Sequence, residues 1–236
     1  MVIDVPFIFI ALVEIIKALP LTLIITIVPL LVGFAIGIIV AFIRLYKVKG
    51  LHHIADFYVS FLRGTPILLH IMLIYLGLPM IIDQIAAYYG WSFKSNEIPI
   101  LLFVLIAFSL TASAYMSEII RAGILAVSRG QIEAAYSVGM SVPQAMRRIV
   151  FPQAVTAVLP NLCNIFVGFL HTSSIAFIVS QKELNGAANI VASSNLKFLE
   201  SYIAVAIIYW TLTMIAEWIT ALLERRAAVF HKGGIA

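Results

Sequence analysis

Charged residues and cysteines are both scarce in this chain of 236 residues. Charged residues make up 11% of the chain and hydrophobic residues 63%, and the mean hydropathy is +1.09. Because soluble domains carry about 25% charged residues, this composition excludes an ordinary soluble domain and predicts an integral membrane protein. The single cysteine, Cys163, excludes an internal disulfide framework.

Motifs for nucleotide binding, metal binding and acyl transfer are also absent. The sequence contains no G-x-x-x-x-G-K-[ST], no H-E-x-x-H, no G-x-S-x-G and no cysteine cluster. We therefore expect no catalytic residue, no metal site and no cofactor on this chain. The net charge of +4 does not indicate nucleic-acid binding, because the basic residues gather at the ends of apolar segments, where they set membrane topology.

Five apolar stretches are long enough to cross a bilayer, which takes about 20 helical residues. They cover residues 18–43, 64–82, 98–125, 153–179 and 202–223. We expect residues 1–236 to form one all-α transmembrane domain. Residues 1–17 mix charged and apolar positions, which favours a helix in the membrane interface, and they show no pattern of a cleaved signal peptide.

The distribution of basic residues predicts the orientation of the spans. With the N-terminus outside, eleven of the 15 Lys and Arg residues lie on the cytoplasmic side, and the opposite orientation reverses this excess. The polar segment at residues 128–152, between the third and fourth spans, then faces the cytoplasm.

Several residues within the spans carry specific predictions. Gly33 and Gly37 form a G-x-x-x-G pattern, which allows another helix to approach closely. Glu118 and Arg121 are spaced to pair along one helix. His70 is a functional candidate because ionisable groups are costly inside a membrane, but a neutral imidazole bonded to a neighbouring helix fits it at least as well.

The polar segment between the third and fourth spans carries two helix-start signals. Ser128 with Gln131, and Ser141 with Gln144, each match a capping box, in which the two side chains satisfy backbone N–H groups. Gly139 lies between them, where a helix needs a residue that adopts positive φ in order to stop. The sequence therefore predicts a short helix, a glycine turn and a second short helix.

The fourth span is unusually polar. Its amide, imidazole and hydroxyl side chains are those of Asn161, Asn164, His171, Thr172, Ser173 and Ser174. Polar groups are costly in hydrocarbon unless they face a partner or a water-filled cavity. Six of them exceed what helix packing requires, so a pathway lining is favoured over packing alone.

The polar segment resembles the EAA loop of bacterial ABC importer permeases. The resemblance rests on E-A-A at 133–135, on Gly139 after three further residues, and on I-V-F-P at 149–152 after nine more. The family pattern usually has leucine where this chain has Phe151, which is a mild departure.

Longer blocks are similar to the polar amino acid permeases of the histidine/glutamine/arginine type. These blocks are F-L-R-G-T-P-I-L-L (61–69), Y-L-G-L-P (75–79), S-E-I-I-R-A-G-I (117–124), G-Q-I-E-A-A (130–135), M-S-V-P-Q-A-M-R-R-I-V-F-P-Q-A (140–154) and L-P-N-L-C-N-I-F (159–166). The resemblance extends over about residues 18–223, nearly the whole chain.

The resemblance implies a permease subunit of an ATP-driven amino acid importer in the bacterial cell (inner) membrane, in contact with membrane lipid. It implies a second permease subunit, ATPase subunits that bind ATP and Mg, and an external binding protein that delivers the solute. It also implies that the segment at 128–152 docks on the ATPase as a coupling helix. The docking residues carried over from the family pattern are Gly130, Glu133, Ala134, Ala135 and Gly139.

One departure from the family pattern bears on the solute. These permeases usually read L-L-K-D-T-S-L where this chain reads F-L-H-T-S-S-I, so His171 and Thr172 replace a Lys-Asp pair. We expect Asn164, His171, Thr172, Ser173 and Ser174 to line the pathway of a neutral polar amino acid, such as cystine or a similar sulphur amino acid. Alternatively, this subunit is the non-binding partner in a heterodimeric pore.

Two further classes of protein are weighed against the importer. A secondary transporter or channel working without ATP leaves the coupling segment without a role, and five spans without inverted repeats fit it poorly. A membrane scaffold or receptor predicts no solute flux with any partner.

Overall fold

The computed structural model describes residues 3–232, with side chains through Arg226, and this part of the chain is helical with no strand. Five stretches are long and apolar enough to cross a membrane, as predicted. The helices are α1 (Val5–Ile15), α2 (Leu19–Leu45), α3 (Leu51–Gly64), α4 (Ile67–Tyr89), α5 (Ile100–Leu125), α6 (Arg129–Ser137), α7 (Val142–Ala145), α8 (Phe151–Thr172), α9 (Leu184–Asn195) and α10 (Phe198–Lys232).

The N-terminal helix, which was predicted to lie in the membrane interface, is continuous with the first span. α1 continues through a 3₁₀ turn at Ile16–Ala18 into α2, so that helix runs from Val5 to Leu45. Phe7, Ala11 and Ile15 are buried against α9 and α10 in a small apolar core. One face of this helix therefore packs on protein, whereas Val5, Phe9, Ile10 and Val13 on the rest of it stay exposed.

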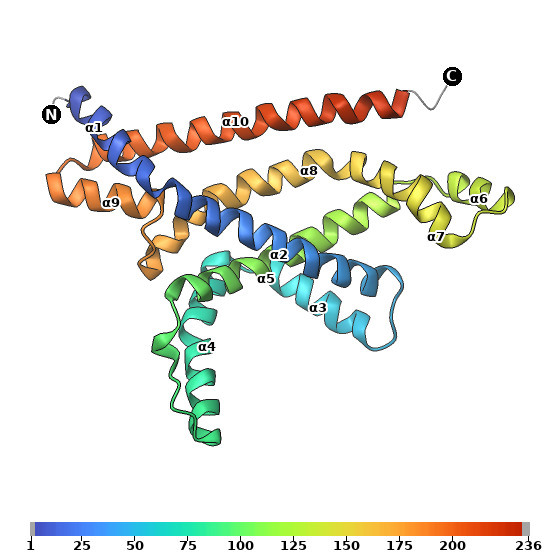
Figure 1. Cartoon of the computed structure of the whole chain (residues 1–236), viewed down its shortest axis with the longest axis horizontal. Coiled ribbons are helices and arrows are strands. Elements are labelled where there is room, and N and C mark those ends of the chain that lie inside the picture. Colours follow the sequence, from blue (N-terminus) through green and yellow to red (C-terminus); the bar gives the residue numbers. More distant parts are fainter. Residues whose placement is uncertain (1–2, 233–236) are drawn as a thin grey trace.

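α2 and α5 cross at the centre of the molecule (Figure 1). A Cβ atom added at Gly33 would lie 2.5 Å from the Cβ of Ala112, and one added at Gly37 would lie 2.8 Å from the Cβ of Met116. Both distances are shorter than van der Waals contact, so the two backbones meet only because these residues are glycines. The close approach predicted from G-x-x-x-G is confirmed.

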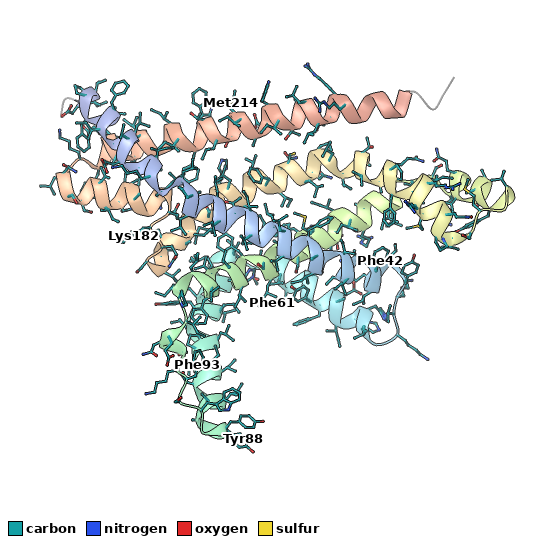
Figure 2. The ribbon with its side chains drawn as sticks, in the orientation of Figure 1. Phe42, Phe61, Tyr88, Phe93, Lys182 and Met214 are labelled. Atoms are coloured by element: carbon teal, nitrogen blue, oxygen red, sulfur yellow. The ribbon has the colours of Figure 1, made fainter. Side chains whose placement is uncertain are left out.

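α4 leaves the other helices at the bend that follows α3 (Figure 1). The helix runs to Tyr89, seven residues beyond the predicted end of the second span, and stops at Gly90, which has a φ of +69°. The loop that returns to α5 is held to α4 because Asp83 accepts hydrogen bonds from the backbone and hydroxyl of Ser95, at 2.7 and 2.8 Å. Figure 2 shows Tyr88 at the far end of this arm.

α6 and α7 form the predicted helical hairpin between the third and fourth spans. Gly139 has a φ of +80° and makes the turn, as predicted. The Ser141 N–H donates to Oε1 of Gln144 at 2.9 Å, which confirms the second capping box. The first is wrong: Ser128 makes no side-chain capping bond, and the Gln131 side chain bonds Gln153 on α8 instead.

Continuous helical backbone begins before the predicted start of the fourth span. α7 passes through a π-turn at Met146–Val150 into α8, and a 3₁₀ turn at Ser173–Val179 follows, so helical backbone runs from Val142 to Val179. The second short helix of the predicted hairpin is thus joined to the predicted fourth span, at residues 153–179, without a break in the helical backbone.

α9 lies between the predicted fourth and fifth spans, at residues for which no helix was predicted. Glu183 caps this helix: its carboxylate accepts hydrogen bonds from the N–H groups of Asn185 and Gly186, at 2.9 and 2.8 Å. Leu184 and Ala188 of α9 are buried in the same core as α1 and α10. Asparagine, serine and glycine are weak helix formers, so packing and the cap override propensity here.

We predict that Gly33→Ala destabilises the protein by about 1–3 kcal/mol, the usual cost of overpacking a tight contact, because the added methyl group collides with Ala112 and the α5 backbone. Gly77→Ala is the matched control, since Gly77 also lies in a membrane helix but has no neighbour within 4 Å of an added Cβ. Thermal unfolding in detergent measures both variants. A Gly33→Ala midpoint at or above that of Gly77→Ala would contradict the close contact.

Candidate functional site

A polar cavity of about 310 Å³ lies between the start of α4, the middle of α5 and the second half of α8. Its hydroxyl, phenol and amide groups come from three helical segments and its remaining wall is apolar. The lining residues are Thr65, Pro66, Ile67, Thr111, Tyr115, Asn164, Ile165, Gly168, Phe169 and Thr172. No charged residue lines this cavity within the described part of the chain.

The break between α3 and α4 brings one side of the cavity into place. Thr65 has extended backbone, and Pro66 then opens α4, because the residue before a proline avoids the helical conformation. Non-helical backbone at membrane depth is tolerated where it lines a cavity. On the opposite wall Gly168 has nothing within 4 Å of an added Cβ, which leaves space beside Thr172.

The structure separates the residues predicted to line the pathway. Asn164 and Thr172 line the cavity. His171 faces α10, where its Nε2 lies 2.8 Å from Oγ1 of Thr213. Ser173 is fully buried and donates to the Leu170 carbonyl. Adjacent helical residues point about 100° apart, so a contiguous run of polar residues cannot all face one cavity.

Ser174 and Asn161 also lie outside the lining of the polar cavity. Ser174 is partly buried and donates to the His171 carbonyl at 2.7 Å, and Asn161 is exposed outside the lining set. Sequence reasoning also missed Thr65, Thr111 and Tyr115, which come from other segments. The signal that could have found two of them is their spacing of four residues, which puts Thr111 and Tyr115 on one face of α5.

His70 is hydrogen-bonded within the protein, in agreement with the prediction of a neutral imidazole bonded to a neighbouring helix. Its Nδ1 lies 2.8 Å from Oγ1 of Thr111 and its Nε2 lies 2.7 Å from Oγ1 of Thr65. A neutral imidazole donates through one nitrogen and accepts through the other. One of the two threonines therefore donates its hydroxyl proton to His70 and not to the backbone carbonyl four residues earlier that it also contacts. His70 therefore fixes two of the hydroxyls that line the polar cavity.

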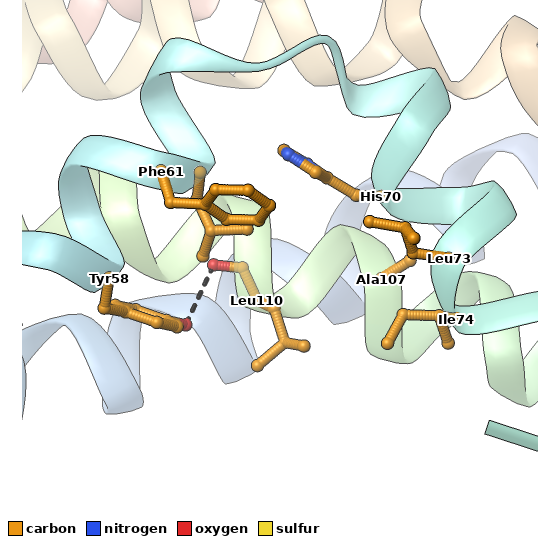
Figure 3. A pocket seen from close by; sticks show the side chains of 8 residues that line it. Tyr58, Phe61, His70, Leu73, Ile74, Ala107 and Leu110 are labelled. Atoms are coloured by element: carbon orange, nitrogen blue, oxygen red, sulfur yellow. Dashed lines mark hydrogen bonds between the residues drawn. The ribbon is translucent and has the colours of Figure 1, made fainter. Parts of the chain in front are cut away.

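A second cavity, of about 230 Å³, has His70 in its lining (Figure 3). Apolar side chains of α3, α4 and α5 line it, among them Phe61, Leu73 and Ile74. Its one phenol, Tyr58, donates to the Leu110 carbonyl at 3.2 Å. Because the polar atoms here are bonded internally, this cavity suits a polar solute less well than the first.

Charged side chains gather one turn beyond the polar cavity along α5. Glu118 accepts hydrogen bonds from Arg44 of α2 and, at 2.8 Å, from Arg121, which confirms the predicted Glu118–Arg121 pair. Arg44 also donates to Asp56 of α3 at 2.6 Å. The contacts with Arg44 were not predicted, because they depend on how three different helices pack against one another.

The residues predicted to dock an ATPase lie in the helical hairpin. Gly130, Glu133 and Ala134 are exposed on α6, and Gly139 is exposed at the turn. Ala135 is buried within the hairpin at 2% exposure. A cavity of about 520 Å³ opens beside α7, lined by Pro143, Gln144, Arg147 and Arg148.

Glu183 is a fully buried carboxylate outside the membrane-spanning stretches. The hydroxyl of Tyr209 on α10 donates to its Oε2 at 2.9 Å, in addition to the two backbone N–H groups of α9. Burial raises the pKa of the Glu183 carboxyl above its ordinary value, and these donors oppose that shift only in part.

A helical membrane protein with a polar cavity among its spans and a hairpin between two of them has the architecture of a transport permease. The chain belongs to the family of binding-protein-dependent transport system inner membrane components, whose family model matches residues 33–229. The family predicted from the EAA loop and the amino acid permease blocks is thereby confirmed.

Individual relatives are amino-acid permeases. The chain is 39% identical to the probable amino-acid permease protein YxeN of Bacillus subtilis (strain 168), over 94% of this chain and 95% of that protein. It is 35% identical to the L-cystine transport system permease protein TcyL of the same organism, over 88% of this chain and 84% of the other. The arginine transport system permease protein ArtQ, also from that organism, is 31% identical over 90% of this chain and 91% of that protein.

Solved structures agree with this assignment. The structure described as an amino acid ABC transporter with histidines matches with a TM-score of 0.82 and 33% identity, over 96% of this chain and 100% of the other. The inward-facing MetNI methionine ABC transporter matches with a TM-score of 0.69 at 17% identity, which shows the shared fold. The protein is therefore a permease component of the amino-acid ABC importer family.

Glu183 gives a prediction for the pH dependence of stability. Because its pKa is raised on folding, its contribution to stability is fully present below the ordinary pKa of 4.5 and is lost as pH rises through the raised pKa. Glu183→Gln removes this titration but also loses part of a hydrogen-bonded cap. The midpoint of thermal unfolding of the variant, relative to wild type, should therefore increase from pH 4.5 to pH 8.

Glu14→Gln is the control for loss of one carboxylate, since Glu14 is exposed. Both variants are measured in detergent against wild type at each pH. A Glu183→Gln difference that stays constant or decreases as pH rises would count against a buried carboxyl with a raised pKa.

Proposed function

We propose that this chain moves a neutral polar amino acid inward through a permease dimer in the bacterial inner membrane. The observation that carries the proposal is the polar cavity between α4, α5 and α8, whose described lining offers hydroxyl and amide groups and no charge. A volume of about 310 Å³ is at the lower end for small-molecule sites. One amino acid therefore fits better than a peptide or a larger solute.

The lining of the cavity favours a solute whose side chain is neutral. A cationic side chain moved out of water needs a carboxylate partner, because an unpaired charge is costly in a low-dielectric site. Thr172 occupies the place where similar permeases usually carry an aspartate. Thr65, Thr111 and Asn164 instead provide neutral hydrogen-bonding groups. Cystine, the solute in the name of the relative TcyL, is one candidate.

ATP-driven movement requires partners that this chain does not contain. Separate ATPase subunits, binding ATP and Mg, dock at the α6–α7 hairpin. A second permease subunit completes the pathway, and an external binding protein delivers the solute. The exposed Glu133 and Ala134 and the basic pair Arg147 and Arg148 give the hairpin a surface on which an acidic or hydrogen-bonding groove can dock. A secondary transporter would not need this surface.

We expect Thr172→Asp to shift solute preference towards cationic amino acids by about tenfold, because a carboxylate in this cavity pairs with a cationic side chain. Thr156→Asp is the matched control: its hydroxyl also bonds the carbonyl four residues earlier on α8, but it lies outside the cavity. Uptake of labelled arginine against glutamine and cystine into proteoliposomes measures the preference. An equal shift in both variants would exclude a specific effect of the cavity.

We expect Glu133→Lys to abolish coupled transport while the protein still folds and inserts, because Glu133 is an exposed docking residue of α6. The measurements are ATP-driven uptake and solute-stimulated ATP hydrolysis in the assembled importer. Glu14→Lys makes the same change of charge on an exposed residue of α1 and should leave both activities intact. Normal uptake by Glu133→Lys would refute docking through this residue.

A further inference from the structure

We propose that Arg63 binds the α-carboxylate of the amino acid as the solute passes from the polar cavity towards the hairpin. This inference rests on the proposed function, since it assumes that an amino acid occupies that cavity. Arg63 lies in the last turn of α3, two residues before Thr65, which lines the cavity. Its guanidinium carbon lies 5.6 Å from the ring centroid of Tyr115, another lining residue. Arg63 therefore lies directly beside the cavity wall.

The guanidinium of Arg63 is not committed to the nearby carboxylate. Arg44 and Arg121 already donate hydrogen bonds to the two oxygens of Glu118. The Nη1 atom of Arg63 lies 3.7 Å from Oε1 of Glu118, which is too long for a hydrogen bond. Within the described side chains Arg63 makes no hydrogen bond, and it is 44% exposed. Its donors are available to a ligand.

The carboxylates around Glu118 leave one guanidinium group without a hydrogen-bonded carboxylate partner. Three guanidinium groups, of Arg44, Arg63 and Arg121, lie near two carboxylates, of Asp56 and Glu118. The cluster therefore carries one excess positive charge. An α-carboxylate, of which glutamine has one and cystine has two, can be bound by a guanidinium through two parallel hydrogen bonds. The neutral cavity holds the polar side chain, and Arg63 supplies the missing partner for the carboxylate.

The position of Arg63 along α5 indicates when this contact is made. Thr111 and Tyr115 line the cavity, and Glu118 follows one turn further towards the hairpin at the end of α5. Arg63, between Tyr115 and Glu118, is thus on the hairpin side of the cavity. A solute that leaves in this direction meets Arg63 next.

The alternative is a purely structural role, in which Arg63 only stabilises the fold through its contacts with Tyr115 and Glu118. A structural residue would affect an amino acid and its carboxamide equally. A carboxylate receptor would affect only the amino acid, because the carboxamide has no negative charge. The comparison of these two ligands separates the roles.

The experiment measures binding of labelled glutamine, arginine and cystine, and competition by their carboxamides. The protein is the purified permease with its ATPase subunits, without the binding protein, so that only the permease selects the ligand. We expect the wild type to bind the transported amino acid about 10- to 100-fold more tightly than its carboxamide, as charge-assisted hydrogen bonds provide. Arg63→Gln should remove this preference, and Arg63→Lys should retain part of it.

Arg121→Gln is the control for disturbing the charge cluster, since Arg121 also bonds Glu118 but does not contact the lining residue Tyr115. This substitution should weaken binding of the amino acid and of its carboxamide equally, so that the preference for the amino acid is kept. The inference is overturned if the wild type shows no preference for the carboxylate, or if Arg63→Gln keeps the wild-type preference. If the complete importer with its binding protein takes up no amino acid, the proposed function fails as well.

Discussion

The contact between α2 and α5 is the constraint on which the rest of the structure depends. Gly33 and Gly37 let the two backbones meet, and this fixes the face that α5 turns away from α2. That face carries Thr111 and Tyr115 into the polar cavity. The same approach brings Arg44, at the end of α2, to Glu118 on α5. A larger residue at either glycine would therefore disturb the cavity and the charge cluster together.

The break between α3 and α4 places a second set of groups against α5. The irregular backbone at Thr65 places its hydroxyl at the cavity wall, and an unbroken helix would not. The bend is stabilised from within, because Thr65 bonds both the Phe61 carbonyl, at 2.7 Å, and the imidazole of His70. His70 is tied in turn to Thr111. The one ionisable residue in the middle of this span thus organises hydroxyls and does not itself line the polar cavity.

Composition and local patterns predicted the five spans, the hairpin and the turn at Gly139, because each depends on residues close together in sequence. The resemblance of the EAA loop and of the longer sequence blocks predicted the family. Composition and local patterns did not predict which polar residues share a cavity: His171 and Thr172 are neighbours, yet one bonds Thr213 on α10 and the other faces the cavity. That outcome depends on helix rotation and on three helices from distant parts of the chain. α9 was missed for a related reason, because tertiary packing and the cap by Glu183 stabilise a segment of weak helix formers.

The hairpin and the cavity share two helices. α5 leads into the hairpin and α8 leads out of it, and the same two helices form opposite walls of the cavity. Between hairpin and cavity the helices touch at Gly123, where an added Cβ would lie 3.1 Å from the Ala154 carbonyl. The contact at Gly123 therefore joins α5 and α8 between the hairpin and the cavity, so both features depend on how closely the same two helices pack.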